Sequence, residues 1–483
     1  MSDHYIDGKW VEGIGDLLLS TNPATQEEIW RGHEATEQEI EKAVQAADDA
    51  FDSWSSLSFK QRALMLKKVQ EKISYNFDLL AETISKETGK PLWEAKTEVN
   101  AMIGKVDLSI EAYQLRCPHT ATRLPAAKLH TRFKPHGPLA VLGPYNFPGH
   151  IPNGHIIPAL LAGNTLVFKP SEWTPLVGAL LASCFSKLPT GVINLIQGGP
   201  QTASHLLDHT KIKGVLFTGS FRTGQSIAIR LAANPGKLLA LEMGGNNPLV
   251  IGAIRDIKAA AYLTVQSAFI TSGQRCSCAR RLILTKHVPK EFLDTLKAMT
   301  LSIKVGPYTR QPEPFMGPLI HRPAAEQVLA AEKALIDAGA TSLVPVKEMI
   351  PFTPMLTPGI IDVTTLERND EEVFGPLLQV IHVEDFDEAL IEANRTAYGL
   401  SAGLISDSEE EWSTFFKKVR AGVVNWNTPL TGASGRAPFG GIGHSGNLRP
   451  SAFFAADYCA YPIASTEVTK VCLPTFITPG VEL

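Results

Sequence analysis

The hydrophobic positions in the first quarter of the chain repeat with the period of an α-helix. Apolar residues within 40–51 are spaced three and four positions apart, which places them on one face of a helix. Thr36 and Glu39 precede this run with the spacing of a capping box, and a second such pair begins at Ser58. The pattern predicts two capped helices, followed by a third helix over about 92–113.

Short apolar runs alternate with segments of helical length in the next part of the chain. The runs lie at 139–142, 165–168, 192–196, 215–217 and 238–241. This alternation is typical of βαβ units that build a parallel sheet. A second series of strands and helices extends from about 248 to 426, so the sequence predicts an α/β protein with two doubly wound domains.

Two segments interrupt this alternation. Residues 117–135 are rich in Pro, Thr, Arg and Lys, and the part from about 451 is apolar with many aromatic residues. We expect short extended pieces in the first segment, which interrupts the domain rather than belonging to its core. The second segment has no sheet of its own, so we expect it to be extended and to pair with another element or another subunit.

Composition and charge narrow the class of protein. The chain has 483 residues, of which 44% are hydrophobic and 19% charged, as in folded globular proteins. Its net charge is −4, whereas nucleic-acid-binding domains carry a basic excess. Its apolar stretches are shorter than the roughly 20 residues of a membrane-spanning helix, and the start MSDHYIDGKW lacks the regions of a signal peptide. We expect a cytoplasmic enzyme that binds neither nucleic acid nor membranes.

The six cysteines indicate neither a disulfide scaffold nor a metal site. Six in a chain of this length is a low density, and no group of Cys and His has the spacing of a zinc site. Cys276, in the run SGQRCSCARR, has the small and polar neighbours of a reactive thiol. It is a candidate nucleophile, with buried packing as the alternative interpretation, which we favour for Cys278.

Two further polar residues follow predicted strands, where a doubly wound sheet binds its ligands. Glu242 ends an apolar run and precedes Gly244 and Gly245, so a partly desolvated carboxylate there suits a general base. Asn146 lies on the loop GPYNFPG, where its side-chain amide is a suitable donor to an oxyanion. A salt-bridge or capping role for Glu242 and a turn role for Asn146 are the alternatives.

A phosphate-binding loop is indicated between one strand and the next helix. The loop consists of Gly219, Ser220, Phe221, Arg222, Thr223 and Gly224. Its backbone N–H groups favour a phosphate, although it lacks the GxGxxG fingerprint. Lys169 and Glu172 follow another strand, where a carboxylate can bind ribose hydroxyls and would repel a 2′-phosphate. This favours NAD over NADP, unless the two residues are only a solvated surface pair.

Taken in order, these motifs resemble the aldehyde dehydrogenase superfamily along essentially the whole chain. The run YNFPGHIPNGHIIPALLAGNTLVFKPSEWTP is similar to that family's oxyanion loop and cofactor block, and EMGGNNP to its general-base signature. SGQRCSCARR is similar to its nucleophile signature and EEVFGPLLQV to its ribose-binding motif. The interval from Glu242 to Cys276 also fits the family's usual spacing.

The resemblance implies a role for each catalytic candidate. Cys276 would attack the aldehyde, and Asn146 with the Cys276 backbone N–H would form the oxyanion hole. Glu242 would activate the water that hydrolyses the resulting thioester. The implied enzyme is a non-acylating, NAD-dependent aldehyde dehydrogenase without a metal.

The resemblance also assigns the cofactor contacts. Lys169 and Glu172 would hold the adenosine ribose, and residues 219–224 would lie along the pyrophosphate. Glu372 and Phe374 would position the nicotinamide ribose and ring.

The domain organisation follows from the same resemblance. It implies an NAD-binding domain of residues 1–116 and 136–241, a catalytic domain of residues 242–449, and an oligomerisation arm and tail of residues 117–135 and 450–483. The implied assembly is a homodimer or a homotetramer.

Longer runs, such as GKPLWEAKTEVNAM and VNWNTPLTGASGRAPFGG, resemble family members that oxidise an acylated glutamate semialdehyde with two carboxylates. We hypothesise that the loop 431–436 binds a carboxylate through backbone N–H groups and that Arg436 adds charge. The residues of this hypothesis are Arg275, Thr431, Gly432, Ala433 and Arg436. A surface role for Arg436 is the alternative.

Three other functions remain open at this point. The first is an aldehyde dehydrogenase for another semialdehyde or for an aliphatic aldehyde. The second is an acylating enzyme that transfers the acyl group to coenzyme A, although such members of the family usually lack the base that Glu242 would provide. The third is a non-catalytic homologue, which would be expected to have lost Cys276 or Glu242.

Overall fold

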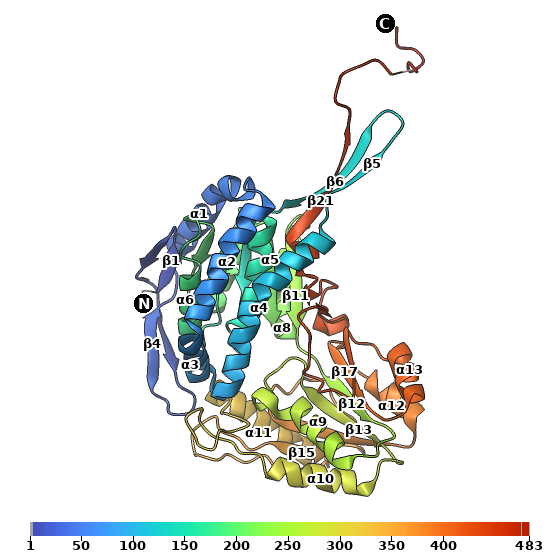
Figure 1. Ribbon diagram of the computed structural model, residues 1–483. Coiled ribbons are helices and arrows are strands. Elements are labelled where there is room, and N and C mark those ends of the chain that lie inside the picture. Colours follow the sequence, from blue (N-terminus) through green and yellow to red (C-terminus); the bar gives the residue numbers. More distant parts are fainter. Residues whose placement is uncertain (1–2, 475, 483) are drawn as a thin grey trace.

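The computed structural model describes residues 3–474 and 476–482. Figure 1 shows two lobes, each built around a seven-stranded sheet, and a narrow arm that extends from the first lobe. Most strands of both sheets run parallel, so the predicted α/β fold with two doubly wound sheets is confirmed. Within the described residues, no helix is both long and apolar enough to cross a membrane.

The first lobe is formed by the first half of the chain. Its sheet contains β1 (His4–Ile6), β2 (Lys9–Val11), β7 (Pro138–Leu142), β8 (Thr165–Lys169), β9 (Ile193–Leu195), β10 (Gly214–Gly219) and β11 (Leu238–Met243), in the order β11-β10-β7-β8-β9-β1-β2. Its helices include α1 (Glu37–Ser55), α2 (Phe59–Tyr75), α3 (Phe77–Thr88), α4 (Leu92–Arg116), α5 (His150–Ala162), α6 (Pro175–Cys184), α7 (Pro200–Asp208) and α8 (Phe221–Leu231). A hairpin of β3 (Leu17–Thr21) and β4 (Glu28–His33) completes it.

Both predicted capping boxes are present. The Thr36 hydroxyl accepts a hydrogen bond from the Glu39 N–H, and the Glu39 carboxylate accepts one from the Thr36 N–H at 2.8 Å. Ser58 and Gln61 form the same pair at the start of α2. These bonds satisfy N–H groups that the first turn of a helix otherwise leaves unpaired.

Helices cover both faces of the first sheet. In β7, Leu139 and Val141 pack into a cluster formed mainly with α2 to α6, whereas Ala140 and Leu142 pack against α1, α7 and α8. Successive residues of a strand point to opposite faces. A strand that is buried on both faces therefore has a continuous run of apolar residues, which is why the sequence pattern predicted these strands.

The second lobe repeats this architecture. Its sheet contains β12 (Asn247–Ile251), β13 (Ala279–Thr285), β14 (Thr341–Val344), β15 (Gly359–Asp362), β16 (Leu377–Val383), β17 (Ser401–Ile405) and β18 (Val423–Trp426), in the order β14-β15-β16-β13-β12-β17-β18. One face packs against α9 (Ile257–Phe269) and α10 (Lys290–Leu301), and the other against α11 (Arg322–Asp337), α12 (Phe386–Ala393) and α13 (Glu409–Lys418).

The arm is a three-stranded antiparallel sheet. The hairpin of β5 (Thr120–Arg123) and β6 (Lys128–Pro135) pairs with β21 (Ala460–Glu467) along the whole length of β6. Figure 1 shows the arm pointing away from both lobes, with the C-terminal residues beyond it. The extended structure expected for this polar segment is confirmed.

The part of the chain before β21 differs from the expected extended tail. It contains a two-stranded sheet of β19 (Pro438–Phe439) and β20 (Ser451–Ala452), and the short helix α14 (Ala455–Cys459). Tyr458 and Cys459 of α14 are buried in the core of the first lobe. The apolar residues expected to be extended are therefore helical here, because they pack against α4 and α5.

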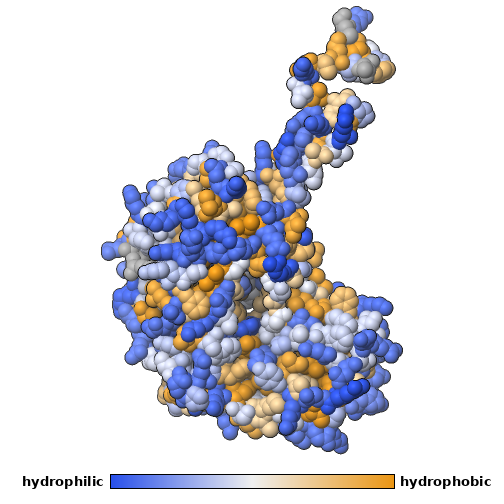
Figure 2. Space-filling view, viewed as in Figure 1, coloured by the Kyte–Doolittle hydropathy of each residue, from blue (hydrophilic) through white to orange (hydrophobic). Residues whose placement is uncertain are grey.

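The carboxyl edge of the first sheet faces the amino edge of the second. Gly244 follows β11, and a Cβ atom there would lie 1.7 Å from a carboxylate oxygen of Glu372, which precedes β16. Figure 2 shows the surface hollowed between the two lobes. The loops after β7 and β11 therefore meet loops that precede strands of the second sheet.

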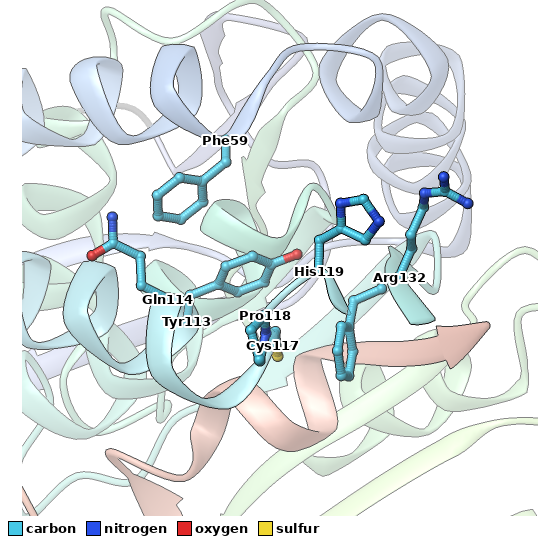
Figure 3. Close-up of a pocket in the computed structure, with 8 residues that line it drawn as sticks. Phe59, Tyr113, Gln114, Cys117, Pro118, His119 and Arg132 are labelled. Atoms are coloured by element: carbon cyan, nitrogen blue, oxygen red, sulfur yellow. The ribbon is translucent and has the colours of Figure 1, made fainter. Parts of the chain in front are cut away.

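A second hollow, of about 540 Å³, lies at the base of the arm. Figure 3 shows Phe59, Tyr113 and Arg132 among its lining residues, and the Phe59 and Tyr113 rings stack with centroids 5.1 Å apart. Its described lining contains none of the candidate catalytic residues. The chemistry therefore belongs to the cavity between the lobes.

Candidate active site

The nucleophile candidate follows a turn with an unusual backbone. Thr271 and Ser272, in the short helix η1 (Ile270–Gly273), have φ angles of 56° and 55°, and Gly273 has 72°. Left-handed backbone is costly for residues with a Cβ, above all for a β-branched one. A Cβ at Gly273 would also lie 2.1 Å from the carbonyl oxygen of Gly375. Such geometry persists only where the surroundings hold it, and here it directly precedes the segment of Cys276.

Side-chain hydrogen bonds hold the backbone of the nucleophile itself. The Asn247 side-chain amide donates to the carbonyl oxygens of Cys276 at 2.7 Å and Cys278 at 2.9 Å. Its oxygen accepts from the Ser401 N–H at 3.1 Å. The sequence analysis did not identify Asn247 as a functional residue. Its only local signal is its place as the second Asn of EMGGNNP. Cys278 is fully buried, in line with packing.

The surroundings that the chain provides disfavour the thiolate form of Cys276. Burial, with the carboxylates of Glu242 and Glu372 nearby, raises the pKa of the Cys276 thiol above its ordinary value, and Arg280 opposes this shift. A thiol must lose its proton to act as a nucleophile. The site therefore needs a proton acceptor close to the sulfur.

Glu242 has the properties of such an acceptor. It lies at the end of β11, is 6% exposed, and accepts a hydrogen bond from the Ser451 hydroxyl at 2.8 Å. Burial raises the pKa of Glu242 to about 7, against the opposing effects of this hydrogen bond and of Lys105. A carboxylate with a pKa near neutral exchanges protons readily at physiological pH, as general base catalysis requires. Ser451 was not foreseen from the sequence.

Two hydrogen bonds to other segments hold Asn146. Its side-chain nitrogen donates to the Gln274 carbonyl oxygen at 2.8 Å, and its own carbonyl accepts from the Lys90 ammonium at 2.7 Å. Lys90 in turn pairs with Glu98 at 2.7 Å, and Glu98 accepts the Gly149 N–H at the start of α5. An amide nitrogen carries two hydrogens, so the second remains for an oxyanion. The bond to Gln274 places this donor beside the segment of the nucleophile.

The predicted phosphate loop is the start of α8. The Ser220 hydroxyl accepts from the Thr223 N–H at 3.2 Å, which makes Ser220 the cap of the helix. A Cβ at Gly224 would lie 2.3 Å from the Met243 sulfur, so glycine allows α8 to pack close to β11. The other first-turn N–H groups have no partner within the helix. This arrangement fits a pyrophosphate.

Phe221 and Arg222 complete this helix start in different ways. The Phe221 ring stacks on His444 with centroids 3.8 Å apart, whereas Arg222 is exposed. Phe221 therefore fixes the position of the first turn, and Arg222 leaves its charge at the surface.

Lys169 and Glu172 lie together after β8. The Lys169 ammonium donates to the carbonyl oxygens of Pro170 and Gly198, both at 2.7 Å, and lies 3.9 Å from the Glu172 carboxylate. Glu172 keeps a third of its side chain exposed. A partly exposed carboxylate at this edge of the sheet fits the hydroxyls of a ribose.

Glu372 and Phe374 lie before β16 rather than after a strand. Glu372 pairs with the buried Arg280 at 3.1 Å, and burial raises its pKa against the effect of Arg280. Arg280 also covers the face of Phe374, whose ring meets Tyr145 edge to face. The expectation that the site lies on loops after strands therefore holds for the first sheet only. Cys276 and Glu372 precede their strands because the second sheet presents its amino edge.

Cys276 and Glu242 share the wall of one cavity, of about 330 Å³, a size typical of small-molecule sites. Its lining from the first lobe includes Lys105, Phe147, His150 and His155, and that from the second lobe includes Arg275, Thr431, Ala433 and Ser434.

The carboxylate hypothesis required backbone N–H groups in the loop 431–436 that are available to bind a carboxylate, and two of them are not. The N–H groups of Gly432 and Ala433 donate to the carbonyl oxygens of Pro429 and Thr431, so they are already bonded within the turn. Arg436 lies outside the lining of the cavity, with 65% of its side chain exposed, and pairs with Glu111 at 2.7 Å. Thr431 and Ala433 do line the cavity. Turn bonding of this kind depends on the folded loop and has no signal in the sequence.

Arg275 lines the cavity but is tied to the first lobe. Its guanidinium pairs with the buried Glu94 of α4 at 2.8 Å and lies over the Phe147 ring. Its Nε donates to the Thr271 hydroxyl at 2.7 Å. Arg275 therefore joins the nucleophile segment to α4.

Comparison with known proteins agrees with this geometry. The model of the aldehyde dehydrogenase family matches residues 10–459. An aldehyde dehydrogenase from Brucella melitensis biovar abortus is 27% identical, with a TM-score of 0.91 over 98% of both chains. A 1-pyrroline-5-carboxylate dehydrogenase from Thermus with bound NAD is 28% identical, with a TM-score of 0.91 over 96% of this chain and 92% of that one.

A third similar structure differs in its cofactor. An Escherichia coli NADP-dependent enzyme is 26% identical, with a TM-score of 0.91 over 96% of this chain and 98% of that one. The start of α8 and the polar groups after β8 fit a dinucleotide of this kind. Because the family model covers almost the whole chain, the protein belongs to the aldehyde dehydrogenase family and is an NAD(P)-dependent oxidoreductase.

Proposed function

We propose that the protein oxidises N-succinyl-L-glutamate 5-semialdehyde to N-succinyl-L-glutamate with NAD, as a step in the catabolism of arginine to glutamate and succinate. The observation that carries the reaction type is the cavity in which Cys276 and Glu242 share one wall. A nucleophile and a hydrolytic base in one cavity support oxidation to a free acid. The substrate is supported by sequence runs such as GPYNFPGHIPNGHI and RPSAFFAADYCAYPIAS, which are similar to enzymes of that specificity.

The proposed reaction uses these residues in sequence. Glu242 takes the thiol proton, and the Cys276 sulfur attacks the aldehyde carbon to form a thiohemiacetal. The free hydrogen on the Asn146 amide donates to the oxyanion. A nicotinamide held by Glu372 and Phe374 would supply the hydride acceptor for the former aldehyde carbon, and Cys276 would then carry a thioester. Glu242 passes the first proton to solvent and then removes one from water, whose oxygen attacks the thioester. The bond from the acyl carbon to the Cys276 sulfur breaks, the acid is released, and the thiolate takes a proton back from Glu242.

The preference for NAD rests on Glu172. Its exposed carboxylate lies beside Lys169 at the edge where the adenosine ribose would bind. A carboxylate there accepts hydrogen bonds from both ribose hydroxyls and repels a 2′-phosphate. The relatives include both an NAD complex and an NADP-dependent enzyme, so this residue, rather than the family, supports the preference.

The proposal includes a cytoplasmic homodimer or homotetramer. All six cysteines are free thiols, as suits a reducing compartment. The arm offers unpaired strand edges at β5 and β21, which support pairing with a second subunit.

Steady-state turnover of a panel of aldehydes tests the proposal. We expect the highest kcat/KM with N-succinylglutamate semialdehyde and NAD, compared with unsuccinylated glutamate semialdehyde, aliphatic aldehydes, and each of these with NADP. Alkylation of the thiol should abolish NADH formation. A higher kcat/KM for another semialdehyde would replace the substrate, and a requirement for coenzyme A would replace hydrolysis with acyl transfer.

A further inference from the structure

Helix α4 buries charged side chains on the face that meets the cavity, and two of them are neutralised by the protein. Glu94 pairs with Arg275 at 2.8 Å, and Glu98 pairs with Lys90 at 2.7 Å. Both carboxylates thereby hold parts of the catalytic apparatus in place. Lys105 lies seven residues after Glu98 and is 4% exposed.

Lys105 differs from these residues because no described residue neutralises it. No carboxylate in the described chain lies within ion-pair distance of its ammonium, and no described residue forms a hydrogen bond with it. The other buried cations all have hydrogen-bond partners within the protein. They are Arg62, Lys90, Lys169, Arg280 and Arg281.

The Lys105 side chain reaches helix α5. Gly154 of α5 faces Lys105, and a Cβ there would lie 3.4 Å from its Cε and 3.7 Å from its Nζ. Both residues line the cavity that contains Cys276 and Glu242. The ammonium is therefore presented to the same space as the reacting groups.

Other charges around the cavity do not replace a ligand for Lys105. Burial lowers the pKa of His150 and of His155 to about 3, so both rings are neutral. Arg275 is paired with Glu94. Burial lowers the pKa of Lys105 to about 8, with Glu242 opposing the shift, so the ammonium keeps its charge at neutral pH.

An unpaired buried ammonium is unfavourable, and an anion that fills the site offsets that cost. We propose that Lys105 binds a carboxylate of the substrate and thereby selects carboxylated semialdehydes over neutral aldehydes. This inference rests on the proposed function and assigns the contact to the α-carboxylate of the glutamate moiety. That group is four bonds from the aldehyde carbon, so both fit into the cavity that Lys105 and Cys276 share.

The positive charge that binds the substrate carboxylate then comes from Lys105 in the first lobe rather than from Arg436 in the second. The sequence hypothesis placed it on Arg436, which is paired with Glu111 outside the cavity. Lys105 needs no rearrangement to meet an anion, because its ammonium already lines the site.

The variant Lys105→Met tests the inference with three aldehydes of graded charge. These are N-succinylglutamate semialdehyde, glutarate semialdehyde and neutral pentanal, each with NAD. We expect kcat/KM to fall about 100-fold for both carboxylated aldehydes, mainly through KM, as on loss of one partner of a buried charge pair. We expect a change of less than about threefold for pentanal. Lys96→Met, on the exposed face of the same helix, is the matched control and should behave as wild type.

A binding measurement keeps the test independent of turnover. Calorimetry with the product N-succinylglutamate should show a Kd about 100-fold higher for Lys105→Met than for wild type. The variant should melt at or above the wild-type temperature, because it loses an unpaired buried charge. Lys105→Gln, which keeps a polar group but no charge, should show the same loss if the methionine variant does not fold.

Each outcome separates the inference from the proposed function. If wild type prefers glutarate semialdehyde but Lys105→Met loses that preference over pentanal, the proposed substrate fails and the inference holds. An equal loss of kcat/KM on charged and neutral aldehydes would show that Lys105 acts through Glu242 and would overturn the inference. So would a wild-type enzyme that oxidises pentanal as efficiently as the carboxylated aldehydes.

Discussion

The two walls of the active-site cavity differ in how completely the protein satisfies their polar groups. The wall from the second lobe carries Cys276 on a backbone that Asn247 holds by two hydrogen bonds. The wall from α4 and α5 presents Lys105, which has no partner among the described residues, and His150, whose Nδ1 has none either. Groups that must react are fixed before the substrate arrives, and groups that recognise it are left for the substrate to satisfy.

Removing the Cys276 sulfur from the second-lobe wall should reduce turnover more than any other single substitution in the cavity. We expect Cys276→Ala to lower kcat by about 10⁴-fold or more, because the covalent route is lost and only binding remains. Cys278→Ala is the matched control, since that sulfur is buried two residues away and should affect stability rather than turnover. Wild-type turnover by Cys276→Ala, measured as NADH formation, would remove the nucleophile from the account.

Glu242→Gln should have the next largest effect, and its pH dependence identifies the base. We expect kcat to fall by about 10²–10⁴-fold. A base acts only when it is deprotonated, and the pKa of Glu242 is raised to about 7. Wild-type kcat should therefore rise with pH through about 7 and level off above it. The variant should lack this rise, and an unchanged profile would assign the base to another group.

Asn146→Ala should cost about 10²–10³-fold in kcat, as for the loss of one oxyanion donor. The change should appear in kcat rather than KM, because the donor binds the transition state more strongly than the aldehyde. A loss confined to KM would mean that Asn146 only orders the segment of Gln274.

Arg436→Met should have the smallest effect, and it sharpens the contrast with Lys105. Arg436 forms an exposed pair with Glu111, and such pairs contribute about 0–1 kcal/mol to stability. We expect kcat/KM for carboxylated and neutral aldehydes to change less than about threefold, with Glu111→Gln as the control. A selective loss for the dicarboxylate would return the recognising charge to the loop 431–436.

Much of the fold was predictable because its signals are local. The capping boxes at Thr36 and Ser58 begin helices where expected, and the apolar runs became strands because both of their faces are buried. The helix α14 was not predictable, since its residues fold against α4 and α5, which lie far away in the sequence.

The candidate site was predictable only in part. The motifs around Cys276 and Glu242 drew attention to both residues, and the fold brings them to one cavity. Lys105 was not predicted as a site residue, because a lysine in a helix is usually exposed. The signal that could have indicated it is its spacing of seven from Glu98, which places both residues on the same, buried face of the helix. The carboxylate role of Gly432 and Ala433 could not be judged, because their N–H groups are consumed only in the folded turn.

The central claim is that Cys276 forms a thioester which Glu242 hydrolyses. Intact-protein mass spectrometry of Glu242→Gln, mixed with NAD and the preferred aldehyde, tests this most directly. Acylation is slower in this variant, because Glu242 also takes the thiol proton. The account therefore predicts an adduct that accumulates on long incubation, with the mass of the acyl group, located on Cys276 by peptide mapping and absent from the double variant with Cys276→Ala. Turnover without any adduct on Cys276, or an adduct on another residue, would contradict it.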